Sequence, residues 1–378
     1  MANKKEDLWQ WLQNQADLLP SEKQQDDAAA ILSYEYSHSS GAVNEPIIQY
    51  RLFEAETPFP SKKDTTFTFI DLFAGIGGFR LAMQNLGGQC VYSSEWDEDA
   101  KKTYCHNFGE IPFGDITKPA VKSFIPDKFD VLCAGFPCQA FSIAGYQRGF
   151  NDTRGTLFFD VASIIKDHRP KAFFLENVKN LKSHDNGRTF EVIEKTLQDL
   201  GYVVYNKVLN TMEYANIPQN RERIFIVGFD PKQVPNHQEF KFPPKQPLTR
   251  TIHDCIDYSE KDESLFYRDD CRYFPFLKET MTNNNTVYQW RRQYVRQNQS
   301  SVCPTLTANM GTGGHNVPLI ITPDGFRKLT PKECLNFQGF PEKYTFPNIA
   351  KSKCYKQAGN SVTVPLIQTV AKQIIDLL

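Results

Sequence analysis

The sequence contains no apolar run long enough to cross a membrane, and no hydrophobic region of a secretory signal follows its first residues. It has no CxxC pair, and its nine cysteines show no regular spacing. This argues against a disulfide framework or a zinc site and for a reducing compartment. The net charge of -1 lacks the basic excess typical of nucleic-acid-binding proteins, although such a footprint can be local. We therefore expect a cytoplasmic protein without a membrane segment or a bound metal.

Changes in sequence pattern divide the chain into four parts. Residues 1–66 predict a weakly structured or small helical extension, which ends in a linker marked by Pro58 and Pro60. From 67 to 239, apolar β-rich segments alternate with helical ones, which predicts an α/β fold with a mostly parallel sheet and helices on both faces. Residues 240–344 are polar and irregular and predict a recognition domain. Residues 345–378 predict a segment with an amphipathic helix that returns to the sheet.

The expected elements of the α/β part can be placed by residue number. The predicted strands are 67–73, 89–94, 129–134, 172–176, 202–209 and 224–229. The predicted helices include 79–86, 156–167, 189–200 and 363–378.

A cysteine follows the third predicted strand on a proline-bearing turn, Gly135-Phe136-Pro137-Cys138. Open α/β sheets place their chemistry at the carboxyl ends of strands, so the Cys138 thiol is a candidate nucleophile. The alternative is a buried structural cysteine. Glu176 ends the next strand, and Arg221 and Arg223 would face one side of an extended segment. These groups predict an active site, with a buried salt bridge and surface arginines as the alternative.

A second group of residues predicts a nucleoside site. Gly75 and Gly77 follow the first strand and let a ligand approach the backbone, but no GxGxxG pattern is present, which disfavours NAD or FAD. Glu95, about 20 positions later, is placed like the usual ribose ligand of such folds. Trp96 can cover an adenine face, and Asp115 can accept a hydrogen bond from its amine. The best candidate has an adenosine but no pyrophosphate, such as S-adenosylmethionine.

In their order, these segments resemble the motifs of bacterial DNA (cytosine-5)-methyltransferases of type II restriction–modification systems. The resemblance covers about 67–378, and residues 1–66 and 240–320 lie outside the shared pattern. It rests on Asp71–Gly78, Glu95-Trp96, Gly114-Asp115, Gly135–Ser142, Glu176-Asn177-Val178, Gln219–Arg223, Arg327–Pro341 and Gln357–Val362. The resemblance implies a Rossmann-like, S-adenosylmethionine-dependent methyltransferase fold with a small target-recognition domain.

The resemblance also implies an activity. A methyl group would pass from S-adenosylmethionine to C5 of a cytosine in a short specific duplex DNA sequence, leaving S-adenosylhomocysteine. The base would be flipped out of the duplex, with a transient bond between Cys138 and C6. Glu176 would contact N3 and the amine, and Arg223, helped by Arg221, would contact the O2 side. No metal takes part. The enzyme would be a monomer of the bacterial cytoplasm that protects host DNA from a cognate restriction endonuclease.

By the same resemblance, a set of residues lines the cofactor pocket: Phe73, Gly75, Gly77, Glu95, Trp96, Asp115, Ile116, Pro137, Leu157, Asn360 and Val362. Residues 143–156 predict a mobile lid with phosphate-binding arginines. The DNA-binding candidates are Ser142, Arg148, Arg154, Arg291, Arg292, Arg296 and Thr305. For the arginines at 291, 292 and 296, a solvated basic strand is the alternative. Two other functions stay open: an RNA cytosine-5 methyltransferase and a non-catalytic DNA-binding regulator.

Overall fold

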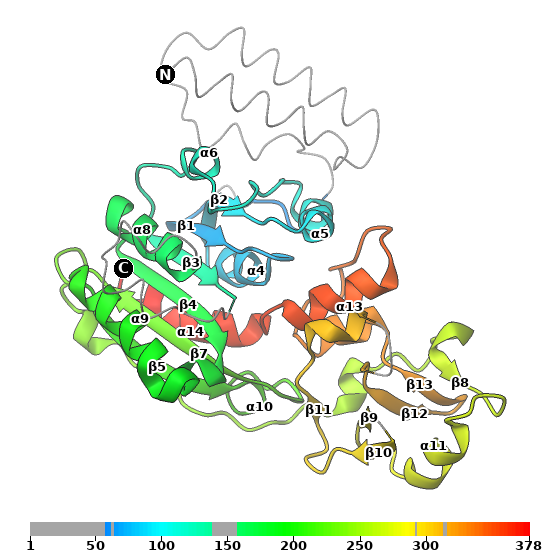
Figure 1. Ribbon diagram of the computed structural model, residues 1–378. Coiled ribbons are helices and arrows are strands. Elements are labelled where there is room, and N and C mark those ends of the chain that lie inside the picture. The colour runs from blue at the N-terminus through cyan, green and yellow to red at the C-terminus, as the bar shows by residue number, and fades with distance from the viewer. Residues whose placement is uncertain (1–56, 62–63, 138–156, 292, 313–315) are drawn as a thin grey trace, which may run out of the picture. The chain divides into compact units, whose positions relative to one another are not determined.

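The computed structural model describes residues 57–61, 64–137, 157–291, 293–312 and 316–378 (Figure 1). These residues form two compact units. The first contains the described residues up to Lys207, together with Ile224–Lys241 and Ala371–Leu378. The second contains Val208–Arg223 and Phe242–Val370. The second unit therefore includes residues 208–223, before the predicted limit at 240, and extends beyond the predicted limit at 344.

The first unit is built on a six-stranded sheet with the strand order β2-β1-β3-β4-β7-β5. β1 pairs in parallel with β2 and with β3, and β3 pairs in parallel with β4. The strands are β1 Phe67–Leu72, β2 Gly88–Ser94, β3 Val131–Gly135, β4 Ala172–Val178, β5 Val203–Asn210 and β7 Glu222–Phe229. Nearly all residues of β1, β3 and β4 are buried. Strands covered on both faces read as continuous apolar runs, which is why the sequence predicted these strands.

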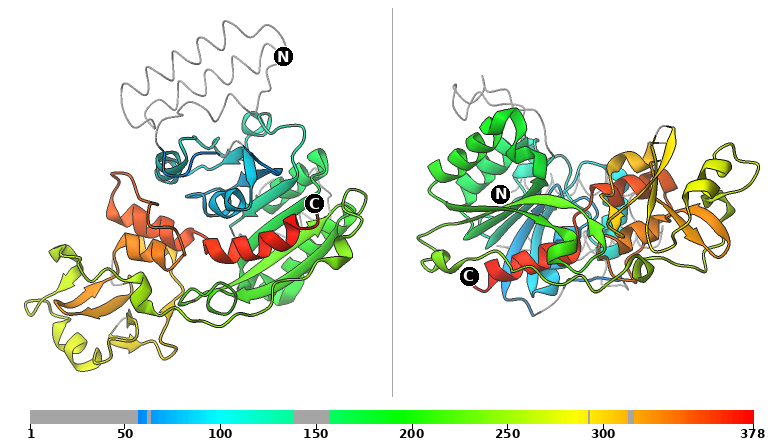
Figure 2. Two further views of the ribbon diagram at one scale, coloured as in Figure 1. Left: turned by 180° about the vertical axis from the view of Figure 1, so that it is seen from behind. Right: turned by 90° about the horizontal axis from the view of Figure 1, so that it is seen from below.

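Helices cover both faces of this sheet, as predicted. Figure 2 shows α8 and α9 on one face and the last turns of α14 on the other. The α-helices that begin in this unit are α4 Gly78–Asn85, α5 Glu98–Phe108, α6 Pro119–Lys122, α8 Leu157–His168 and α9 Arg188–Asp199. The 3-10 helices are η2 Lys179–Lys182, η3 His184–Gly187 and η4 His237–Glu239. Helix α5 was not among the helices predicted from the sequence. Asp97 caps its N-terminus, and Gly109 follows its last turn with a φ of 71°.

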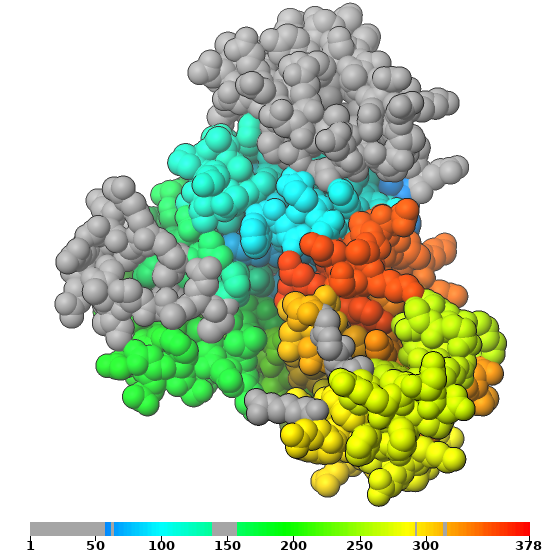
Figure 3. Space-filling model, turned by 45° about the vertical axis from the view of Figure 1, so that its right-hand side comes forward, coloured from blue at the N-terminus to red at the C-terminus, as the bar shows by residue number. Residues whose placement is uncertain are grey.

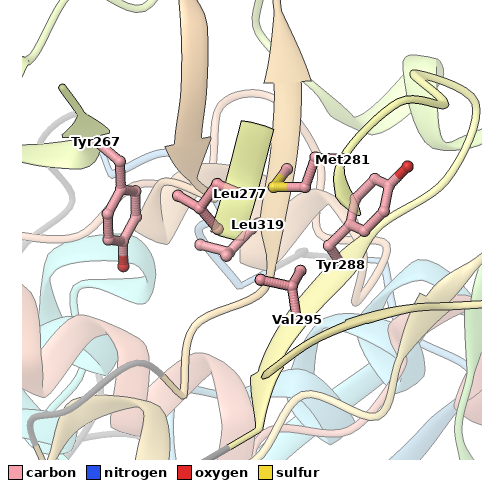
Figure 4. Packing of buried hydrophobic residues seen from close by; sticks show 6 residues of the cluster. All are labelled: Tyr267, Leu277, Met281, Tyr288, Val295 and Leu319. Atoms are coloured by element: carbon pink, nitrogen blue, oxygen red, sulfur yellow. The ribbon is translucent and has the colours of Figure 1, made fainter. Parts of the chain in front are cut away.

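The second unit contains a five-stranded sheet with the order β10-β9-β12-β13-β8, in which neighbouring strands pair antiparallel. Its strands are β8 Phe266–Tyr267, β9 Tyr288–Arg291, β10 Tyr294–Gln297, β12 Leu319–Thr322 and β13 Gly325–Lys328. A short parallel pair joins β6 Gln219–Asn220 to β11 Cys303–Pro304. Figure 4 shows the small hydrophobic core of this sheet, which consists of Tyr267, Leu277, Met281, Tyr288, Val295 and Leu319.

Short helices complete the second unit. The α-helices are α10 Thr211–Tyr214, α11 Phe274–Thr280, α12 Pro331–Asn336, α13 Lys351–Asn360 and α14 Val364–Ile375. The 3-10 helices are η5 Ile252–Cys255, η6 Glu263–Leu265 and η7 Ala308–Gly311. Within the described ranges of the whole chain, no helix combines the length and the apolar character needed to cross a bilayer.

Asp71 is a carboxyl group buried in β1. Asp71 is 1% exposed, and neither of its carboxyl oxygens has a hydrogen-bond partner in the described part of the chain. Burial raises the pKa of Asp71 from 3.8 to about 8, and the charge of Arg80 offsets this only in part. At pH values between 3.8 and about 8, the folded protein therefore keeps a proton on Asp71 that the unfolded chain has lost.

This difference predicts a stability change with pH. Between the unfolded pKa of 3.8 and the folded value of about 8, the folded state binds more protons, so its stability falls as the pH rises. The decrease from this group is roughly 1 kcal/mol per pH unit. We expect Asp71→Asn to remove this part of the slope, so that the variant gains on the wild type as the pH rises. Urea unfolding of both proteins at several pH values measures the gain, and parallel pH profiles would contradict it.

Candidate functional site

At one position of the turn between β1 and α4, the backbone conformation and the lack of space both require glycine. Gly77 has a φ of 80°, and a Cβ there would lie 2.3 Å from the Phe108 ring. Gly75 and Phe73 both have a φ of 55°. The Ala74 N–H donates to the Ser94 carbonyl at the end of β2, with 2.9 Å between N and O. The turn is thereby attached to the second strand, with Gly75 half-buried and Gly77 buried.

The Glu95 carboxylate makes the second attachment between the same two segments. It is 7% exposed and accepts from the N–H groups of Gly75 at 2.7 Å, Trp96 at 2.9 Å and Asp97 at 2.8 Å. Burial raises the pKa of Glu95, while these backbone N–H groups act in the opposite direction. A carboxylate has about four lone-pair sites, so Glu95 retains capacity for a ligand hydroxyl.

Trp96 follows Glu95 in the chain, and one backbone bridge brings the segment that carries Asp115 beside them. Phe113 pairs in parallel with Ser94, and the Glu95 N–H donates to the Phe113 carbonyl at 2.8 Å. The Trp96 side chain is 72% exposed, as expected of a ring that a planar ligand can cover. Asp115 is half-buried, and its Oδ1 accepts from the N–H and the hydroxyl of Thr117. These contacts bring Glu95, Trp96 and Asp115 to one edge of the sheet. They are the residues predicted to bind the ribose, the adenine face and the adenine amine.

The other predicted cofactor residues differ in their burial. Ile116 is buried, Pro137 is exposed after β3, and Leu157 is the half-buried first residue of α8. Asn360 and Val362 belong to the second unit, where Asn360 is exposed and Val362 is buried. Each keeps its predicted role as an expectation.

The ends of β3 and β4 carry the described part of the predicted catalytic site. Gly135 pairs with Glu176, and a Cβ on Gly135 would lie 3.7 Å from the Glu176 Oε2. The Asn177 Nδ2 donates to the Phe136 carbonyl at 2.8 Å. The chain that leads to Cys138 therefore leaves the sheet beside the Glu176 carboxylate, with its first residue held by Asn177.

Several predicted residues lie outside the described part of the chain. They are Cys138, Ser142, Arg148, Arg154 and Arg292, and the predicted lid 143–156 lies there as well.

Arg221 joins three segments of the second unit. It is 2% exposed, and its guanidinium donates to the carbonyls of Leu306 at 2.8 Å, Gly359 at 3.2 Å and Ser361 at 2.6 Å. These carbonyls belong to the predicted recognition segment and to the segment that carries Asn360. The described contacts of Arg221 are thus those of a buried crosslink, and its assistance at the target base stays a prediction.

Two glutamines extend this crosslink. The Gln219 Nε2 donates to the Phe337 carbonyl at 2.6 Å, and its Oε1 accepts from the Leu306 N–H at 3.2 Å. The Gln338 Nε2 donates to the Ala358 carbonyl at 2.9 Å. Leaving buried donors and acceptors without partners is costly, so this network favours one arrangement of its segments.

Close backbone packing supports the same arrangement. A Cβ on Gly359 would lie 2.3 Å from the Thr307 carbonyl group, and one on Gly311 would lie 2.0 Å from the Ser352 carbonyl oxygen. Helix α13 therefore contacts η7 directly through two glycines. Figure 3 shows these segments side by side, η7 in orange-yellow and α13 in orange-red.

A polar cavity of about 430 Å³ opens in the second unit. Arg291 pairs with Tyr294 and Arg296 with Gln289 across the β9–β10 hairpin. Alternation along the strands puts Gln289, Arg291 and Arg296 on one face. The cavity is lined by Asn220, Glu222, Gln289, Trp290, Arg291, Arg296, Asn298, Pro304, Thr305, Thr307, Asn309 and Asn316.

The cavity relates three of the predicted DNA-binding residues to the predicted catalytic segment. Thr305 donates from its hydroxyl to the Asn220 carbonyl at 2.7 Å. Arg223 follows the cavity residue Glu222 in β7, is half-buried, and donates from Nη1 to the Glu222 carbonyl at 2.8 Å. The stretch 288–296, which includes Gln289, was predicted to belong to the recognition region. Asn220, Glu222 and Asn298 were not singled out from the sequence, and the structure adds them to this surface.

The Arg221 crosslink predicts a large stability cost for a conservative change. We expect Arg221→Lys to lower the free energy of unfolding by at least about 2 kcal/mol, because an ammonium cannot reach carbonyls spread over the guanidinium plane. The exposed Arg296→Lys is the matched control and should stay within about 0.5 kcal/mol of the wild type. Denaturant unfolding of both variants measures the difference, and equal small effects would show that Arg221 is not a crosslink.

Comparisons with known proteins agree with this geometry. The sequence profile of the C-5 cytosine-specific DNA methylases matches residues 67–376. The type II methyltransferase M.Bsp6I of Bacillus sp. (strain RFL6) is 51% identical over 308 residues, which are 80% of this chain and 96% of that protein. The type II methyltransferase M.HpaII of Haemophilus parainfluenzae is 46% identical over 351 residues, which are 89% of this chain and 96% of that protein.

A solved structure of Spodoptera frugiperda DNMT2 is similar in fold, with a TM-score of 0.62 at 18% identity over 82% of this chain and 100% of that chain. The predicted methyltransferase fold and the predicted family are thus confirmed. The profile spans most of the chain. The chain belongs to the C-5 cytosine-specific DNA methylases and is a DNA cytosine-5 methyltransferase.

Proposed function

We propose that this enzyme methylates one cytosine within a short specific sequence of duplex DNA, using Cys138 as a covalent nucleophile. The observation that carries the proposal is the pairing of Gly135 with Glu176 at the ends of adjacent parallel strands. Cys138 follows Gly135 by three residues, so the thiol and the carboxylate belong to neighbouring strand ends. Chemistry at this edge is the rule for open α/β sheets.

The proposed reaction begins with addition of the thiolate to the target base. The Cys138 thiolate attacks C6 of the flipped cytosine, and the electron pair of the C5–C6 double bond moves toward C5 and the ring. Glu176 at N3 stabilises this charge, and Arg223 at the O2 side orients the base. C5 then takes the methyl group, its proton passes to solvent water, and the thiolate leaves to restore the aromatic ring. A target base must leave the stack for this attack.

S-Adenosylmethionine supplies the methyl group, as membership of the family implies. We propose that Glu95 accepts hydrogen bonds from its ribose hydroxyls, that Trp96 covers its adenine and that Asp115 accepts from the adenine amine. The Gly75–Gly77 turn would lie against its methionine part. The support is the shared edge formed by Glu95, Trp96 and Asp115.

The second unit would read the DNA sequence with the cavity face of β9 and β10. Arginine and glutamine can each make paired hydrogen bonds to base edges in the major groove. Asn309 and Asn316 add amide groups at the same cavity. We further propose that the enzyme acts as a monomer in the bacterial cytoplasm and protects host DNA from a cognate restriction endonuclease, as the type II names of its relatives suggest. The family assignment favours DNA over RNA and an enzyme over a pure binder.

Covalent catalysis predicts a trapped complex. A duplex with 5-fluorocytosine at the target should form an adduct that survives denaturation, because the fluorine replaces the proton needed to release Cys138. Gel electrophoresis of the denatured complex measures it. Cys138→Ser should give no such adduct, while Lys278→Ala, a change on the surface of α11 outside the cavity, should still form it. An adduct in Cys138→Ser would exclude this thiol as the nucleophile.

Base reading by the cavity predicts a sequence-dependent loss. We expect Arg296→Ala to weaken binding of the cognate duplex by about 1–3 kcal/mol and to relax the choice of one base pair. Lys278→Ala, a surface cation on α11 outside the cavity, should leave both unchanged. Titration of cognate and singly changed duplexes measures the two affinities. Equal weakening on every duplex, with a flatter salt dependence, would assign Arg296 to a phosphate instead.

A further inference from the structure

Residues 57–61, which we call the strap, lie before the region that the family profile matches and yet pack on the cofactor half of the enzyme. The Phe59 N–H donates to the Asn107 carbonyl at 2.9 Å. The Gln84 Nε2 donates to the Pro60 carbonyl at 2.6 Å. The Phe59 and Phe108 ring centroids are 6.2 Å apart. The strap thus contacts both α4 and α5, whereas the sequence had predicted a linker there.

Ser61 of the strap completes the partners of a fully buried arginine. Arg80 is 0% exposed and forms a bidentate ion pair with Glu110, at 2.5 Å and 2.8 Å. Its Nε donates to Gln84 at 2.8 Å, and its Nη1 also donates to the Tyr104 hydroxyl at 3.1 Å. One N–H of Nη2 points to Glu110, and its second N–H donates to the Ser61 Oγ at 2.8 Å. A guanidinium has five N–H donors, so the Ser61 hydroxyl uses the last of them.

The Ser61 hydroxyl is also a donor in this cluster. It donates to the Glu110 Oε1 at 2.8 Å. Without Ser61, one buried N–H of Arg80 and one carboxylate oxygen of Glu110 each lose a partner. Unmatched buried polar groups are costly, so the α4–α5 packing would have to shift or admit water.

The same cluster lies directly against the glycine turn of the cofactor site. A Cβ on Gly77 would lie 2.3 Å from the Phe108 ring and 3.2 Å from the Tyr104 ring. The Arg80 guanidinium lies over the Phe108 ring, 5.2 Å from its centroid. Phe108 therefore contacts the strap through Phe59 and the turn through Gly77. A ring so constrained fixes the backbone that it touches.

We propose that the strap is a positioning element of the cofactor site, which holds the Gly75–Gly77 turn through Phe108 and Arg80 in the geometry that S-adenosylmethionine requires. This inference rests on the proposed use of that turn and of Glu95 by the cofactor. A preorganised turn loses less freedom when the ligand binds, so the strap raises cofactor affinity without touching the cofactor. Cofactor affinity in this enzyme then depends on residues outside the shared family pattern.

The test measures binding of S-adenosylhomocysteine to the full chain by calorimetry, without DNA. We expect Phe59→Ala and Ser61→Ala each to weaken binding roughly tenfold, the factor that about 1.4 kcal/mol represents. The KM for S-adenosylmethionine should rise by a similar factor, while kcat with saturating DNA stays close to the wild type. Ser61→Thr keeps the hydroxyl and should restore affinity. If Phe59→Ala does not fold, Ser61→Ala and its Thr rescue carry the test.

A matched control separates local positioning from general destabilisation. Tyr205 is a half-buried aromatic of β5, which ends the sheet at the edge opposite β2, and its ring packs on Phe240 with centroids 5.2 Å apart. Tyr205→Ala should lower the melting temperature and leave the affinity for S-adenosylhomocysteine unchanged. Equal weakening by Tyr205→Ala, or wild-type affinity in both Phe59→Ala and Ser61→Ala, would overturn the proposal.

Glu95→Ala distinguishes failure of the strap from failure of the site. If Glu95→Ala binds S-adenosylhomocysteine as the wild type does, the cofactor site itself is misplaced, and the strap proposal falls with it. If Glu95→Ala loses affinity while both strap variants keep it, the site stands and only the strap proposal is wrong.

Discussion

The buried carboxylate of Glu95 is the contact on which the cofactor half of this enzyme depends. By accepting N–H groups from Gly75, Trp96 and Asp97, it joins the turn after β1 to the end of β2. Parallel strands bring their carboxyl ends to one edge, but each strand end is followed by a loop that is free to diverge. Glu95 removes that freedom, because a buried acceptor must keep its donors. In the proposed cofactor site, one side chain would therefore serve both ligand binding and loop geometry.

The second unit is held by the opposite arrangement, a buried donor surrounded by acceptors. Arg221 and Gln219 come from the segment that also contains Arg223, and their partners lie in the recognition segment and before Val362. The contacts of Gly359 with Thr307 and of Gly311 with Ser352 allow these backbones to meet. The cavity residues Thr305 and Asn309 lie in the segment so fixed. In both units a few buried polar groups set the position of exposed ones, so each set of proposed functional side chains has a rigid support.

The sequence predicted the strands of the first unit to within a few residues. Glu95, Trp96 and Asp115, which it grouped by their order, follow neighbouring segments joined by a backbone bridge, and their shared role stays a prediction. It did not reveal the five-stranded sheet, since strands as short as Phe266–Tyr267 carry no periodicity and find their partners far along the chain. It presented Arg221 as a companion of Arg223, because local alternation cannot show that carbonyls more than eighty residues away surround it. The strap was hidden for a similar reason: a run of Pro, Ser and Lys is typical of a linker, and only the buried Arg80 gives Ser61 a structural task.

The central claim is that this chain transfers methyl groups to C5 of cytosine in DNA through Cys138. Bisulfite sequencing of plasmid DNA from a host that expresses the enzyme tests it most directly, because only 5-methylated cytosines resist conversion. We expect protected cytosines in a single short sequence context, and complete conversion in a host that expresses Cys138→Ala. Complete conversion with the wild-type enzyme, or protection that persists with Cys138→Ala, would contradict it.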